Sequence, residues 1–71
     1  MASGAKHIGW TVRVLMEDEV IVTYAVGLAN HLDAEKAVAD KRHTKGEQYK
    51  AIDPITENHG PPVELGEVRA V

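Results

Sequence analysis

Two runs rich in β-branched and aromatic residues, 8–16 and 20–28, lie on either side of the charged tripeptide 17–19, Glu-Asp-Glu. Residues of these types favour strands, and a short polar segment between two such runs is typical of a β-hairpin. This hairpin constrains the fold more than any other feature, because a chain of 71 residues has room for one small domain arranged around it.

The register of the hairpin follows from the apolar pattern. A three-residue loop at 17–19 brings only apolar residues opposite one another on one face, and a five-residue loop gives the same pairing. A shift of one residue would turn a strand's side chains to the other face, so the pattern predicts this register strongly. The expected pairs are Met16 with Val20, Val14 with Val22, Val12 with Tyr24, Trp10 with Val26, and Ile8 with Leu28.

The second face of the hairpin is mixed in character. It is too apolar for a face in full contact with water and too polar for a core, which is typical of an interaction surface. Its two opposed glycines either admit the backbone of a partner or are simply tolerated near strand ends. A further alternative is that the C-terminal segment covers this face through Leu65 and Val68. The candidate interface residues are Gly9, Arg13, Leu15, Ile21, Thr23 and Gly27.

A helix over residues 33–44 is expected to cover the apolar face of the hairpin. Asp33 suits the N-cap, Leu32 before it can pack against Ala37, and Gly46 ends the helix. The side facing the sheet is narrow and made mostly of small residues, so the helix should lie close to the strands. Its members at helical spacing are Ala34, Ala37, Val38 and Lys41.

Residues 47–53 are predicted to form a third strand, limited by Pro54. A crossover through the helix would place this strand beside the first one and antiparallel to it. The expected fold class is therefore α+β: a small β-β-α-β domain with a three-stranded antiparallel sheet in the order 2-1-3 and one helix packed on one face.

The remaining segments are expected to be accessory. We expect residues 1–7 to be a flexible N-terminus, 8–55 the β-β-α-β domain, and 56–71 a loop and C-terminal segment able to dock on it. The irregular apolar spacing in 63–71 is compatible with a short helical turn, a docked edge strand or a frayed tail.

Net charge, the length of the longest apolar run and the cysteine content limit the partners and the compartment that we expect for the chain. The net charge of −3 argues against a general nucleic-acid binder, and the longest nearly apolar run, 20–29, is too short to span a bilayer. The chain has no cysteine, which fits a reducing compartment, so we expect a cytoplasmic protein. A domain this small buries limited surface and has no disulfide to stabilise it, so we expect a homodimer.

No catalytic constellation is identifiable, and we expect no enzyme activity, no cofactor and no bound metal. The leading hypothesis is a non-catalytic protein-interaction domain that self-associates through a sheet face or edge, or that binds another protein. The alternative is a small-ligand or metal-binding domain. Its site would lie around Gly9, Trp10 and Gly27, or at His31, Asp40 and His43.

Overall fold

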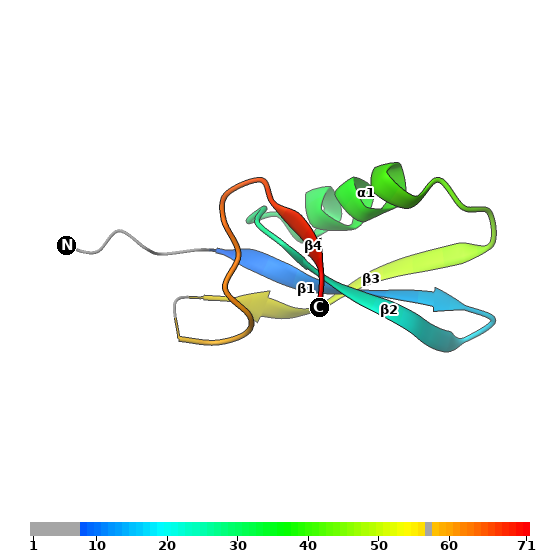
Figure 1. The fold of residues 1–71 in the computed structure, drawn as a ribbon, viewed down its shortest axis with the longest axis horizontal. Helices are drawn as coiled ribbons and strands as arrows, with labels where there is room; N and C mark the ends of the chain where they lie inside the picture. The colour runs from blue at the N-terminus through cyan, green and yellow to red at the C-terminus, as the bar shows by residue number, and fades with distance from the viewer. Residues whose placement is uncertain (1–7, 57) are drawn as a thin grey trace.

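The computed structural model describes residues 8–56 and 58–71, so the expected flexible segment 1–7 lies outside the described residues. Four antiparallel strands form one sheet in the order β3-β1-β2-β4, and helix α1 lies on one face of it (Figure 1). The elements are β1 (Gly9–Met16), β2 (Glu19–Val26), α1 (His31–Arg42), β3 (Glu47–Ile55) and β4 (Val68–Ala70).

This arrangement confirms a small α+β fold with one helix and an antiparallel sheet in which β1 lies between β2 and β3. The predicted number of strands is wrong, because a fourth strand extends the sheet beside β2. The order 2-1-3 holds for the first three strands, and β4 is added as a new edge beyond β2.

The hairpin keeps the predicted register away from its tip and departs from it near the turn. Val14 pairs with Val22 as expected, but Leu15 pairs with Val20, so Ile21 is an extra residue that forms a β-bulge. The turn contains only Glu17 and Asp18, with φ of 52° and 67°, as a type I′ turn requires. The three-residue loop and the Met16–Val20 pair are therefore wrong: the bulge compensates for the shorter turn and preserves the apolar pairing beyond it.

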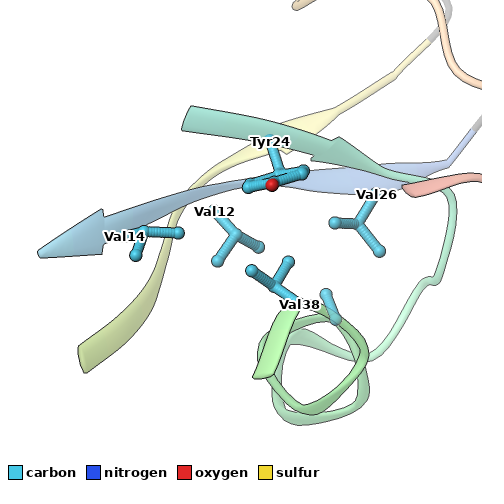
Figure 2. Packing of buried hydrophobic residues seen from close by; sticks show 6 residues of the cluster. Val12, Val14, Tyr24, Val26 and Val38 are labelled. Atoms are coloured by element: carbon cyan, nitrogen blue, oxygen red, sulfur yellow. The ribbon is translucent and has the colours of Figure 1, made fainter. Parts of the chain in front are cut away.

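The main core lies between the sheet and α1. It contains Val12, Val14, Tyr24, Val26, Ala34 and Val38, and Figure 2 shows Val38 extending from the helix toward the valines of the strands. The helix contributes only the small side chains of Ala34 and Val38 as fully buried residues. Small residues allow α1 to lie close to the strands, as the sequence predicts, whereas Lys41 is exposed.

The start of α1 differs from the prediction because a better-placed cap precedes Asp33. The side-chain oxygen of Asn30 accepts hydrogen bonds from the backbone N–H groups of Leu32 and Asp33, at 2.8 and 3.1 Å. Asn30 is therefore the N-cap, and Asp33 lies inside the first turn. Leu32 belongs to the helix and is 62% exposed, so the predicted packing of Leu32 before the cap is wrong.

The end of α1 also comes earlier than predicted. His43 adopts a left-handed conformation (φ 52°) and its backbone N–H donates to the carbonyl of Ala39, which ends the helix at Arg42. Gly46, with φ of 87°, instead lies in the turn that leads into β3.

Strand β3 runs two residues further than predicted, through Pro54 to Ile55. Proline has no N–H for a second neighbouring strand, and β3 is an edge strand that has only β1 beside it. The outer position explains why Pro54 does not end the strand.

The C-terminal segment folds back on the sheet. Residues 68–70 form β4 against β2, so the docked edge strand is the alternative that the structure adopts. Before it, Val63 reaches the second face and forms a smaller cluster with Ala25 and Ile55, all three essentially buried. The alternative in which Leu65 and Val68 provide this cover is not what the structure shows, since Leu65 is 91% exposed and Val68 packs against the main core.

Candidate interaction surface

The chain itself covers half of the second sheet face. The backbone of Gly27 makes two hydrogen bonds with the C-terminal segment, donating to Glu67 O and accepting from Gly66 N, both at 2.8 Å. A β-carbon at Gly27 would overlap with the carbonyl oxygen of Glu64, and one at Gly9 with that of Val26. The two glycines thus admit the close approach of this chain's own backbone, and both are buried.

The other half of the face, toward the hairpin turn, carries apolar side chains without such a cover. Leu15 and Val20 lie opposite each other in the ladder, and Ile21 is the bulge residue beside them. Val71 continues the line of β4, and its N–H donates to Thr23 O at 2.9 Å. Leu15 is partly buried, while Val20, Ile21 and Val71 are 50%, 47% and 57% exposed. We call these four residues, Leu15, Val20, Ile21 and Val71, the tip patch.

The tip patch lies between charges of opposite sign. Two residues before Leu15 on β1, Arg13 pairs with Lys50 of β3 and with Thr23 of β2. Residues directly opposite in antiparallel strands share a face, so the two basic side chains lie next to each other, and both are exposed. On the far side of the patch the turn carries the exposed acids Glu17 and Asp18.

A polar network on the helix side lies toward the turn end of the hairpin, where Glu47 is the β3 partner of Met16. The Arg42 guanidinium donates from Nε and Nη2 to the two carboxylate oxygens of Glu47, both at 2.8 Å. Arg42 Nη1 also donates to the hydroxyl of Tyr24 (3.2 Å), and the hydroxyl of Tyr49 donates to Glu47 Oε1 (2.8 Å). The network joins the end of α1 to β2 and to the start of β3.

The network also perturbs the titration of its members. Hydrogen bonding from Arg42 lowers the pKa of Glu47 below its ordinary value, although the side chain is only 1% exposed. Hydrogen bonding to Glu47 raises the pKa of Arg42, and burial raises that of Tyr49. A carboxylate that accepts a bidentate arginine and a tyrosine hydroxyl is well suited to fix structure and poorly suited to exchange protons near neutral pH.

Sequence reasoning missed this network. Arg42 and Glu47 are five residues apart in the sequence, across the end of a helix. That spacing is not one at which helical neighbours meet, so no local pattern indicates the pair.

Each of the two residue sets proposed for the alternative ligand site is divided in the structure. Alternation along β1 places Trp10 on the helix side and Gly9 on the second face. The indole Nε1 donates to Ala29 O at 2.8 Å, and the indole and the His31 ring form an edge-to-face pair with centroids 5.7 Å apart. His31 and His43 lie at opposite ends of a helix about 18 Å long.

Pockets and metal-binding clusters are two further kinds of site. Over 8–56 and 58–71 the chain forms no pocket and holds no group of three or more His, Asp or Glu residues arranged for a metal ion. In the same ranges, no helix is long and apolar enough to cross a membrane.

The two sheet edges are partly blocked. Edge strand β3 uses the N–H of Ala51 to donate to the Glu35 carboxylate of α1 at 2.8 Å. The opposite edge strand, β4, is only three residues long. Short edge strands and side chains that occupy edge hydrogen-bonding groups both disfavour the addition of another strand.

Comparison of the chain with protein-family models, with curated proteins and with solved structures gave no match.

Proposed function

We propose that this chain is a non-catalytic protein-interaction domain that self-associates through the open half of its second sheet face. The observation that carries the proposal is the tip patch, in which Val20, Ile21 and Val71 are each about half exposed next to Leu15. Contiguous apolar side chains on a sheet face favour burial against another surface. The same face is already covered at its other end by Val63, so the tip patch is the part left for a partner.

We favour association through the sheet face over addition of a strand at a sheet edge, because both edge strands are poorly suited to pair with an incoming strand. An incoming strand at β3 would compete with Glu35 for the N–H of Ala51 and would find no N–H at Pro54. Strand β4 offers only three residues for pairing. The interface residues proposed here are therefore Arg13, Leu15, Val20, Ile21, Thr23 and Val71.

The size of the patch implies weak association. The open half covers at most four strands at about 4.8 Å spacing and about 14 Å of strand length, a few hundred Å² in projection. Stable interfaces of standard size bury roughly 800 Å² per partner. We therefore expect a dimer with a dissociation constant on the order of 100 µM rather than a permanent one.

Sedimentation velocity over a range of concentrations tests the proposal. The wild-type chain should move from monomer to dimer on concentration, and Ile21→Ser should weaken the dimer by about tenfold because it removes apolar area from the contact. Ile21 is half exposed, so the substitution should leave the fold of the monomer intact.

The matched control is Leu65→Ser, which removes a still more exposed apolar side chain from the C-terminal turn, outside the tip patch. It should leave the association unchanged. A wild-type chain that stays monomeric at millimolar concentration, or a loss of association caused equally by both variants, would contradict the proposal.

A further inference from the structure

We infer that the partner seated on the tip patch is a second copy in antiparallel orientation, with the acidic turn of each copy over the basic residues of the other. The inference rests on the proposed self-association and adds its geometry. It follows from the order of residues in the first arm of the hairpin and its turn: Arg13 and then Leu15 on β1, followed by Glu17 at the first position of the turn.

The spacing of these residues is symmetric about the patch. Arg13 lies two residues before Leu15, about 7 Å along the extended strand, and Glu17 lies two residues after Leu15, where the turn begins. A two-fold axis that passes over Leu15, parallel to the sheet and across the strands, therefore exchanges the two charged positions. It places Glu17 of each copy over Arg13 of the other while Leu15, Val20 and Ile21 meet at the centre.

The surrounding charges reinforce the same orientation. Lys50 is the β3 partner of Arg13, and Asp18 follows Glu17 in the turn, so each end of the interface has two charges of one sign. Stacked sheets lie about 10 Å apart with strand directions within about 30°, a gap that an arginine and a glutamate side chain bridge together.

The alternative two-fold arrangement brings like charges together. An axis parallel to the strands would place the acidic turn of one copy over the turn of the other, and Arg13 over Arg13. Like charges placed opposite each other disfavour an arrangement, so the charge pattern selects the antiparallel one. The helix does not interfere, since α1 lies on the other face and the hairpin extends past its C-terminal end (Figure 1).

A double-mutant cycle on the full chain tests the orientation. Arg13→Glu and Glu17→Lys should each weaken association by about tenfold, since each converts two attractive contacts per dimer into repulsive ones. The double variant exchanges the two charges and should return to within about threefold of the wild-type dissociation constant. Lys36→Glu, the same kind of charge reversal at an exposed position of α1, is the matched control and should have little effect.

The salt dependence of the wild-type dimer supplies a second measurement that needs no variant to fold. Raising the ionic strength from about 0.05 M to about 1 M shortens the screening length from more than 10 Å to about 3 Å, so the dimer should weaken severalfold. A contact made by apolar side chains alone would be unchanged or strengthened.

The outcomes separate the two claims. A monomeric wild-type chain would overturn both the proposed function and this inference. A dimer that Ile21→Ser disrupts, but in which the two charge reversals add instead of compensating, would overturn the orientation and leave the proposed surface standing.

Discussion

At Gly27 the absence of a β-carbon allows the C-terminal segment to lie directly against the sheet. The C-terminal turn lies against the Gly27 backbone and forms two hydrogen bonds with it. Sequence reasoning treated this glycine and Gly9 as a place where a partner's backbone could approach. Close approach is what the structure shows, but the backbone that approaches belongs to the same chain.

We expect Gly27→Ala to destabilise the fold by about 2 kcal/mol or more, because the added β-carbon would displace the backbone at Glu64. Gly46→Ala is the matched control: its β-carbon enters open space, and only the left-handed backbone costs about 1 kcal/mol. Chemical denaturation measures both free energies of unfolding. Equal losses for the two variants would show that the C-terminal turn does not pack on Gly27 as described.

Because of Glu47, the free energy of unfolding should decrease at acid pH. Its pKa is lowered in the folded state by hydrogen bonding from Arg42, so the ionised form is favoured by folding. Such a group stabilises the fold fully above its unfolded pKa, and the contribution is lost as the pH falls through the lower folded value. The loss should therefore begin near the ordinary value of 4.5 and continue below it.

Glu47→Gln should reduce the pH dependence of the free energy of unfolding in this acid range. Glutamine does not titrate, so between about pH 5 and 3 the free energy of unfolding of the variant should fall less steeply than that of the wild type. Thermal unfolding across this range, with the exposed Glu64→Gln as control, measures the difference. Parallel profiles for the wild type and Glu47→Gln would argue against the Arg42–Glu47 pair.

Among the elements, the start of helix α1 is set by the residue whose side chain caps it, Asn30, and not by the first acidic residue, Asp33. The sequence prediction placed the cap at Asp33, although the side chain of Asn30 is equally typical of an N-cap. Only the chain path out of β2 decides between them, because it gives Asn30 the extended backbone conformation that a cap requires.

We expect Asn30→Ala to lower the free energy of unfolding by about 1 kcal/mol, since two backbone N–H groups lose their acceptor. Asp33→Ala should cost about 0.5 kcal/mol or less, because it removes only a favourable charge from the first turn. Urea titration of both variants gives the order of the two effects, and the reverse order would make Asp33 the cap.

The sequence predicted the structure well where a residue type or the periodicity of apolar residues is enough to decide it. The alternation of apolar residues predicted the paired strands and the face that α1 covers, and the crossover predicted β3 beside β1. It could not indicate the bulge at Ile21, because a three-residue loop and a two-residue turn with a bulge give the same pairing from Val14–Val22 onward, and only Val20 changes face.

The other differences between prediction and structure come from features that are too short to show a pattern or that depend on residues distant in the sequence. Strand β4 has only three residues, too few to show a periodicity, and its pairing depends on the path of the preceding loop. Of the six predicted interface residues, the structure buries Gly9 and Gly27 and leaves Arg13, Leu15, Ile21 and Thr23 around the open half of the face. The contribution of Val20 and Val71 to that surface required the register and the position of β4.

At the scale of the whole molecule, the two faces of the sheet have different roles. One face is closed by α1, and the other is closed at one end by the segment that precedes β4 (Figure 1). The tip patch and the opposite charges on either side of it occupy the part that remains. We propose that this part of the surface contacts a second copy of the chain.

A dilution series followed by methyl NMR tests this claim most directly, because it reports contacts residue by residue in the unmodified chain. The methyl signals of Leu15, Val20, Ile21 and Val71 should shift together with concentration and give one common dissociation constant. Leu32 and Leu65, which are exposed outside the patch, should stay constant. Invariant signals from the tip patch at millimolar concentration, or shifts confined to Leu32 and Leu65, would contradict the account.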